Sequence, residues 1–418
     1  MRKMRDSGIE WVGAIPNHWR VSKIKQIVRW KSVKGQPDLP VLSLYRDYGV
    51  IPKDSRDDNH NVTSLDTSGY KVVEHGDLVI NKMKAWQGSL AVSEYNGIVS
   101  PAYHICKITS ENICKKYLHY LLRDASYLPE YMRLSTGLRV GQWDLSFDDF
   151  KNIPFLVPPL AEQERIAAFL DAECSEIDAV LEKTRASIEE YKKLKQAVIT
   201  QAVTKGIRDN RPMKDSGIEW IGEIPAEWGV VPHKRIMHKV KEICEQYNGE
   251  DVISLTVNGV VKRDLTAGGK MPTSFDGYQY VEPNDLLLCL FDIDVTPRCV
   301  GVVRDYGVTS PAYSRFVMHD GYYNAYYDYL LRMIDDNKVF VHLSKNLRSS
   351  LTESDFGAIK TCAPPLAEQK CIAAFLDVRC DEIDALIAKK QQYLTEIENY
   401  KKSLIYEYVT GKKEVHPL

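Results

Sequence analysis

Apolar residues recur with a helical period along two long stretches of the chain, residues 158–204 and 364–410. Each stretch opens with Pro-Pro-Leu-Ala-Glu-Gln, and neither contains a glycine or a further proline. Spacings of four and three alternate, which is the heptad pattern of paired helices. We predict one long helix in each stretch, starting just after its prolines. The expected stripes are Ile177, Leu181, Thr184, Ile188, Tyr191, Lys195, Val198 and Ala202 in the first stretch, and Ile383, Ile387, Lys390, Leu394, Ile397, Lys401, Leu404 and Tyr408 in the second.

A helix with one apolar stripe needs a partner, and the obvious partner of each predicted helix is the other. The alternative is that each helix packs separately against its own domain. A lysine interrupts both stripes at the same place, Lys195 in the first and Lys401 in the second. Such a lysine could fix the register of the pair, or its aliphatic stem could lie along the apolar surface with the charge in water. Both interpretations stay open at this point.

The helices are not the only repeat, because residues 4–19 and 213–228 share Asp-Ser-Gly-Ile-Glu-Trp, an Ile-Pro pair and a second tryptophan. The whole chain is therefore two copies of one unit. The Ile-Pro pairs favour an extended arm. The tryptophans are large apolar groups in a polar segment, and we expect them to anchor each arm onto its own domain. They are Trp11, Trp19, Trp220 and Trp228.

Two more divergent bodies, residues 20–157 and 229–363, lie between the arms and the helices. Each contains three short β-type runs, a Pro-Ala-Tyr after the third run and a short helix with Tyr-Leu-Leu-Arg. We predict an α/β (α+β) chain with two similar mixed α/β domains, separated by two long helices that form an antiparallel coiled coil with a pseudo-two-fold repeat. The expected runs are 41–44, 77–80, 98–100, 252–255, 285–288 and 308–310, and the expected helices 117–123 and 326–332. The expected boundaries are 1–157, 158–206, 207–363, 364–412 and a tail at 413–418.

Composition narrows the picture without naming a partner. The chain has 418 residues, 44% apolar and 27% charged, which suits ordinary globular domains. No apolar run approaches a membrane span and no signal peptide is evident, so we expect a cytoplasmic protein. The nine cysteines have no C-x-x-C spacing, which favours reduced thiols and indicates neither a metal site nor a cofactor. The net charge of −2 does not indicate a nucleic-acid partner, although residues 20–34 are basic without an intervening acid.

Two similar bodies joined by a paired rod suggest an object that measures distance. A helix of about 40–45 residues spans on the order of 60 Å. Duplex DNA suits a protein with two recognition domains at a fixed separation, because its major groove returns to the same face about every 34 Å. Bodies with different surfaces would read different base pairs and leave those between them unread.

The duplicated arm, D-S-G-I-E-W-x-G-x-I-P-x-x-W, and the duplicated helix start, P-P-L-A-E-Q-x-x-I-A-A-F-L-D, resemble those of DNA-specificity subunits of type I restriction–modification systems. The resemblance covers essentially the whole chain. It implies two target-recognition domains, each reading half of a split double-stranded DNA sequence. It also implies an antiparallel coiled coil that sets the spacer and docks two methyltransferase subunits, with restriction/translocase subunits joining the complex.

The resemblance further implies a subunit with no catalytic residues. In agreement, the sequence lacks the Asp/Asn-Pro-Pro-Tyr/Phe motif of DNA methylation and the phosphate-binding loop G-x-x-x-x-G-K-S/T. Asn81 and Lys82 follow Asp77, but the acid expected two residues before the lysine of a restriction nuclease is missing. A stand-alone nuclease and a protein–protein scaffold without a DNA role remain the alternative functions.

Candidate DNA-binding residues lie in polar loops of both bodies. Arg139 and Arg348 occupy equivalent loops, and we expect phosphate contacts there because the residue is shared. The alternative for this pair is an ion pair with acids of the same domain. Base readers should differ between the bodies, which gives Arg46, Lys82, Lys84, Gln87 and Gln142 in the first, and Lys262, Arg263, Lys345 and Asn346 in the second.

Candidate partner-binding residues lie in the first turn of each long helix. They are Glu162 and Gln163 in the first helix, and Glu368 and Gln369 in the second. The alternative interpretation is that the two glutamates serve the helix start itself, where negative charge is favourable.

Overall fold

In the computed structural model the chain forms two compact units. The first unit comprises residues 1–185 and 392–418, and the second comprises residues 186–391. The structure describes residues 2–46, 48–56, 63–137, 143–266, 272, 274–296, 298–344 and 349–415. Each unit therefore contains one body and part of both long helices.

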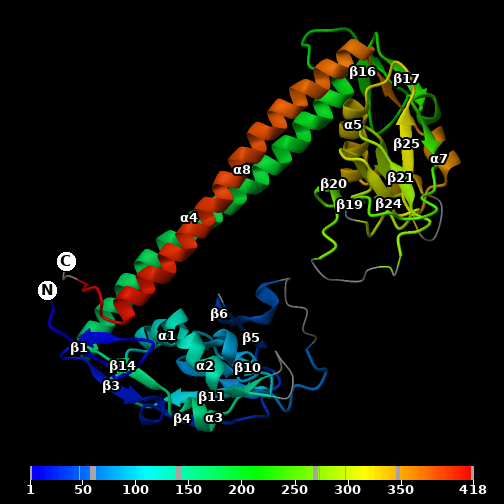
Figure 1. Ribbon diagram of the computed structural model, residues 1–418. Helices are drawn as coiled ribbons and strands as arrows, with labels where there is room; N and C mark the ends of the chain where they lie inside the picture. The colour runs from blue at the N-terminus through cyan, green and yellow to red at the C-terminus, as the bar shows by residue number, and fades with distance from the viewer. Residues whose placement is uncertain are drawn as a thin grey trace. The chain divides into compact units, whose positions relative to one another are not determined.

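Both predicted long helices are present and begin directly after their prolines. Helix α4 spans Leu160–Lys205 and helix α8 spans Leu366–Val409. They lie side by side (Figure 1). Every position of the two predicted stripes is buried or half-buried, so the heptad prediction is confirmed.

Ion pairs between the two helices define their direction in the first unit. Arg185 of α4 pairs with Glu398 of α8 at 2.7 Å. Asp178, two turns earlier in α4, accepts hydrogen bonds at 2.6 and 2.7 Å from Lys401, which lies later in α8. Residue numbers rise along one helix as they fall along the other, so the pair is antiparallel, as predicted.

The second unit repeats this arrangement. Lys195 of α4 donates a hydrogen bond of 2.6 Å to Asp384 of α8. Lys390 of α8 lies 5.6 Å from the ring of Tyr191 in α4. The lysine that interrupts each stripe thus reaches an aspartate of the opposite helix, and the two aspartates occupy equivalent positions in the repeat. This geometry favours the register interpretation over a stem that only covers apolar surface.

The ends of the helices also enter the cores of the bodies. In the first unit, Ile166 and Leu170 from the start of α4 share a core with Leu404 and Val409 from the end of α8. The start of α8 and the end of α4 share the core of the second unit in the same way. The alternative of packing on the body therefore holds for the terminal turns, including stripe residues such as Ala202 and Leu404, whereas the middle parts of the two helices contact each other.

The body of the first unit is built from short strands and three short helices. The helices are α1 (Lys115–Arg123), α2 (Leu128–Leu134) and α3 (Phe147–Phe150). The strands are β1 (Met4–Asp6), β2 (Ala14–Pro16), β3 (Arg20–Lys23), β4 (Val28–Lys31), β5 (Leu42–Tyr45), β6 (Gly49–Pro52), β7 (Lys71–Val73), β8 (Asp77–Asn81), β9 (Leu90–Val92), β10 (Gly97–Val99), β11 (Tyr103–Ile108), β12 (Ser135–Thr136), β13 (Asp144–Leu145) and β14 (Pro154–Val157).

The central sheet of this body is antiparallel, with the strand order β4-β11-β8-β9. The two-stranded pairs β5-β6 and β10-β7 pack on it through a second core that includes Leu42, Leu44, Val79 and Val99. The arm folds as the hairpin β1-β2, and β3 pairs with β14, the strand that leads into α4.

The body of the second unit has the same plan. Its helices are α5 (Asn324–Asp336), α6 (Val339–Leu343) and α7 (Glu353–Ala358). Its strands are β15 (Met213–Asp215), β16 (Glu223–Pro225), β17 (Gly229–Pro232), β18 (Met237–Val240), β19 (Val252–Thr256), β20 (Gly259–Lys262), β21 (Gln279–Val281), β22 (Leu286–Leu288), β23 (Val300–Val302), β24 (Gly307–Thr309), β25 (Ser314–Met318) and β26 (Lys360–Ala363).

The central sheets of the two bodies correspond strand for strand. The order β18-β25-β22-β23 repeats β4-β11-β8-β9, and a second sheet has the order β20-β19-β24-β21, with β19 and β24 parallel. All six predicted β-type runs coincide with strands, and the two predicted short helices lie within α1 and α5. Across the described ranges no helix has the length and apolarity that a membrane span requires.

Candidate nucleic-acid interface

The first turn of α4 holds the arm of the first unit. The Glu162 carboxylate pairs with Arg2 and lies 2.9 Å from His18 Nε2. Trp19, 1% exposed, donates its indole N–H to the same carboxylate at 3.1 Å. The predicted anchoring role of this tryptophan is confirmed, and its acceptor is a side chain of the long helix.

The neighbouring Gln163 is fully buried and holds the body instead of the arm. Its amide N–H donates a hydrogen bond of 2.8 Å to the Pro158 carbonyl. Its amide oxygen accepts a hydrogen bond of 2.9 Å from the backbone N–H of Cys114. Because Cys114 directly precedes α1, one side chain fixes the start of α4 to the start of α1.

The second unit repeats this junction almost atom for atom. Trp228 donates 2.9 Å to Glu368, and Arg211 binds both oxygens of the same carboxylate. Gln369 donates a hydrogen bond of 2.7 Å to the Pro364 carbonyl. It accepts another of 2.7 Å from the backbone N–H of Tyr323, which directly precedes α5. The two junctions therefore share their geometry.

The charge of both glutamates is stabilised where they lie. Burial alone would raise the pKa of Glu162 and of Glu368. Hydrogen bonds from His18 and Arg2 to Glu162, and from Arg211 and Trp228 to Glu368, outweigh burial, so both pKa values lie below the usual range. The four residues predicted to bind partners are thus engaged within their own units, which favours the helix-start alternative for the glutamates.

Two further contacts of the junctions were not recognised from the sequence. The Tyr117 hydroxyl donates 3.0 Å to the carbonyl of Val409 at the end of α8. The equivalent Tyr326 donates 2.8 Å to the carbonyl of Val203 near the end of α4. Both tyrosines belong to the shared Tyr-Leu-Leu-Arg helix, and Arg2 and Arg211 lie at the same offset as the arms. That repeated offset is the signal that could have found them.

Three of the predicted DNA-binding residues lie in the loop after β8. Lys84 and Gln87 are exposed, whereas Lys82 pairs with Asp144 at 2.8 Å. Trp86 packs edge-on against Trp143, with ring centroids 5.2 Å apart, so these tryptophans brace the loop. The pair joins the loop to the segment just after residues 138–142.

The other described candidates lie apart from that loop. Arg46 follows β5 and is exposed, and its carbonyl accepts a hydrogen bond from Arg123. Lys262, at the end of β20, pairs with Asp251 at 2.8 Å and lies 3.5 Å from Asp305. The hydrogen bond to Asp251 raises its pKa. Arg263 is exposed directly after it. Arg139, Gln142, Lys345, Asn346 and Arg348 lie outside the described residues.

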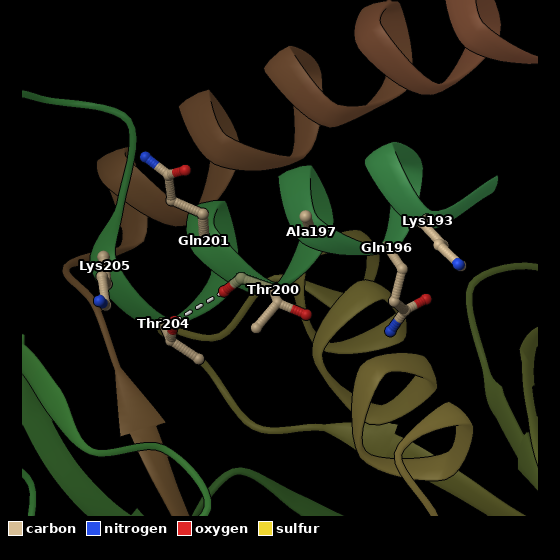
Figure 2. A pocket seen from close by; sticks show the side chains of 7 residues that line it. All are labelled: Lys193, Gln196, Ala197, Thr200, Gln201, Thr204 and Lys205. Atoms are coloured by element: carbon tan, nitrogen blue, oxygen red, sulfur yellow. Dashed lines mark hydrogen bonds between the residues drawn. The ribbon is translucent and has the colours of Figure 1, made fainter. Parts of the chain in front are cut away.

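One groove of about 670 Å³ runs along the last turns of α4 in the second unit. Figure 2 shows the seven side chains that line it, and they include no carboxylate, histidine or cysteine. Thr204 uses its hydroxyl to bond the Thr200 carbonyl at 2.6 Å. Among the described residues no cluster of His, Cys, Asp and Glu could hold a metal ion. The groove therefore offers a binding surface and no acid–base or nucleophilic pair.

Comparisons with known proteins agree with the duplicated motifs. Residues 16–190 match the family described as type I restriction modification DNA specificity domain. The putative type I restriction enzyme MjaX specificity subunit of Methanocaldococcus jannaschii is 24% identical, covering 97% of this chain and 96% of that protein. The MjaVIII specificity subunit of the same organism is also 24% identical, covering 97% and 95%.

A solved structure has the same fold along the whole chain. It is described as the structural basis underlying complex assembly and conformational transition of the type I R-M system, and its TM-score is 0.71 at 14% identity. The match covers 96% of this chain and 99% of that chain. Residues 16–190 therefore carry the type I restriction modification DNA specificity domain, and the chain is similar over nearly its whole length to specificity subunits of type I restriction enzymes.

Proposed function

We propose that the chain recognises a bipartite double-stranded DNA target, with residues 20–157 reading one half and residues 229–363 the other. The observation that carries this proposal is a shared frame with different surfaces. The same Glu, Gln, Trp and Tyr contacts hold both bodies to the long helices. The exposed loops differ, as Lys84 and Gln87 in the first body and Lys262 and Arg263 in the second illustrate. A constant frame with variable loops suits two readers of unlike sequence.

The spacer between the half-sites follows from the long helices in this proposal. Helix α4 has 46 residues and α8 has 44, without a break in either. Because equivalent lysines of both helices make ion pairs to the opposite helix, the register of the pair is specified twice. A pair of fixed length and register separates two bodies by a set distance. The functional boundaries proposed from the sequence, 1–157, 158–206, 207–363, 364–412 and 413–418, express this division.

Partner subunits would dock on the outer faces of α4 and α8. In the first unit Tyr393 and Tyr400, seven residues apart on α8, are 48% and 56% exposed, and in the second unit Leu194 of α4 is 48% exposed. Tyr393 and Tyr400 lie two turns apart on one face of α8, and apolar side chains grouped on one exposed face mark a site that another protein can cover. We propose two methyltransferase subunits there, joined by restriction/translocase subunits that supply catalysis in the cytoplasm.

Exchange of one body tests this function. The variant replaces residues 20–157 with the corresponding body of another family member and is expressed with its partner subunits. Methylated sites mapped across a genome should then change in one half-site only, with the other half and the spacer unchanged. A change in both halves, or in neither, contradicts the division of labour. DNA binding that does not weaken as salt rises would favour the scaffold alternative.

A further inference from the structure

Two lysines lie opposite each other in the first body. Lys34 and Lys71 are directly paired in an isolated antiparallel bridge of the first body. Lys34 is exposed, whereas Lys71 is only 8% exposed and donates its ammonium to the Tyr103 carbonyl at 2.5 Å. Within the described part of the chain neither lysine forms an ion pair. Like charges opposite each other destabilise a sheet, so this pair works against folding.

A third lysine reaches the same point from another strand. Asn81, the last residue of β8, pairs with Tyr103 at the start of β11. The next residue, Lys82, donates its backbone N–H to the Ala102 carbonyl at 3.3 Å. The Lys71 ammonium and the Lys82 backbone N–H therefore bind the neighbouring carbonyls of Tyr103 and Ala102, and the charge of Lys82 acts on Lys71. We name Lys34, Lys71 and Lys82 the lysine cluster.

The lysine cluster carries an excess of positive charge. Burial lowers the pKa of Lys71, and the charges of Lys34 and Lys82 lower it further. Asp144 is the acid that pairs with the cluster in the described residues, and it bonds Lys82 alone. A buried charge is screened less by water and salt than an exposed one, so Lys71 strengthens the field at the surface above it.

The second body shows that the fold does not need this charge. Ile243 and Gln279 form the equivalent isolated bridge. The Gln279 amide donates 2.7 Å to the Tyr313 carbonyl, as the Lys71 ammonium does to Tyr103. Leu290 occupies the position equivalent to Lys82. It lies two residues after the end of β22, whereas Lys82 directly follows β8, which is longer. A neutral amide can therefore fill the buried position.

We propose that the lysine cluster is a contact site for a DNA backbone phosphate on the first body, with no counterpart on the second. The inference rests on the proposed function and deepens it. An anion would bind the exposed head of Lys34 beside the partly exposed head of Lys82, which also pairs with Asp144, with the charge of Lys71 beneath them, and would relieve their mutual repulsion. Phosphate contacts fix the position of the duplex and carry no sequence information. The cluster therefore adds affinity to the half-site that the first body reads, without altering which bases are read.

The test compares single substitutions in the full chain assembled with its partner subunits. Lys34→Gln removes the exposed charge, and Lys71→Gln installs the residue that the second body uses. Lys107→Gln, at the other end of β11, is the matched control for net charge. Affinity for the mapped target duplex is measured over a range of salt concentrations. Lys34→Gln should not lower the thermal unfolding temperature, because its side chain is exposed and its charge repels that of Lys71.

Each cluster variant should lower the affinity roughly tenfold at moderate salt and reduce the slope of log affinity against log salt by about one. Base preference in both half-sites should stay the same. If Lys34→Gln and Lys71→Gln match Lys107→Gln while the wild-type complex still binds its target with a steep salt dependence, the inference is wrong and the proposed function stands. If the wild-type complex binds no specific duplex, both are wrong.

Discussion

A buried carboxylate occupies the same place in both bodies, yet its charge is neutralised from different strands. In the first body Asp77 of β8 pairs with Lys31 of β4 at 2.9 Å. In the second, Asp285 precedes β22 and pairs with Arg315 of β25 at 2.6 Å. Each carboxylate also accepts a hydrogen bond from the backbone N–H of the glutamate three residues earlier in the chain. The acid is thus part of the shared frame, whereas the cation that pairs with it belongs to a different strand in each body.

A buried histidine in the second body should make that unit sensitive to acid. His233 is fully buried against Phe356, with ring centroids 4.6 Å apart, and Ile24 is its equivalent in the first body. Burial lowers the pKa of His233 to about 4. The unfolded chain, with an ordinary histidine pKa of about 6.5, then binds more protons than the folded one between these values, so stability falls as pH decreases through this range.

His233→Ile should remove about 3 kcal/mol of this acid sensitivity between pH 7 and pH 4. The measurement is the free energy of unfolding of the second unit by urea, at several pH values, for the wild type and the variant. The exposed His75, replaced by glutamine, serves as the control and should leave the pH profile unchanged. Identical profiles for the wild type and His233→Ile would show that the ring is protonated without cost.

At the level of elements, periodicity was the strongest guide. The heptad stripes and the prolines before them predicted α4 and α8 and where each helix begins. Apolar side chains at every third or fourth position lie on one face of a helix, and that face must be buried against a partner. Trp19 and Trp228 could be assigned to the arm anchors because large rings in a polar segment must be buried somewhere. The aspartate partners of Lys195 and Lys401 could not be named, because they depend on the antiparallel register.

The candidate site was less predictable than the elements. Gln163 and Gln369 bond backbone groups of distant segments, and nothing in their local sequence indicates this. Lys82 pairs with Asp144, 62 residues away, and no local pattern around Lys82 indicates that partner. Side-chain partners across a fold depend on tertiary contacts that a linear pattern does not contain, which is why the surface loops remain predictions.

The helix-start junction should depend on one buried charge. Glu368→Gln keeps an acceptor for Trp228 but leaves Arg211, 8% exposed in its side chain, without its buried anion. We expect a loss of about 2 kcal/mol in the free energy of unfolding at pH 7. Because the pKa of Glu368 is lowered, its contribution is complete above about pH 4.5 and disappears as pH falls through the folded-state value. The two proteins should therefore converge in stability once the pH lies below the folded-state pKa of Glu368.

A matched control for this change lies on the same helix. Glu382 pairs with Arg379 at 2.7 Å, but both side chains are more than half exposed. Glu382→Gln should change stability by less than about 1 kcal/mol, since exposed ion pairs contribute little. Equal losses for the two variants would mean that the burial of the Glu368 carboxylate has no energetic weight.

The whole molecule combines a repeated frame with unlike surfaces. The arm, the first turn of each helix and the tyrosine of the shared short helix recur with the same contacts. The lysine cluster of the first body has neutral residues at its equivalent positions in the second. Evolution of a new target half would then need changes in one body only, with the junctions and the helix pair kept. Because the bodies and the helix pair are separate parts, the length of the helix pair can be changed without changing either body.

The proposed spacer role predicts that the helix pair can be lengthened without altering what is read. Three heptads inserted after Ile188 in α4 and after Leu394 in α8 lie at equivalent positions of the repeat and keep the stripes continuous. They add about 31 Å to each helix, close to the roughly 34 Å of one turn of DNA. Methylation mapping should show both half-sites unchanged, with a spacer longer by about nine or ten base pairs. The same insertion in α4 alone leaves three heptads without a partner and should abolish specific methylation, whereas an unchanged spacer in the double insertion would contradict the spacer role.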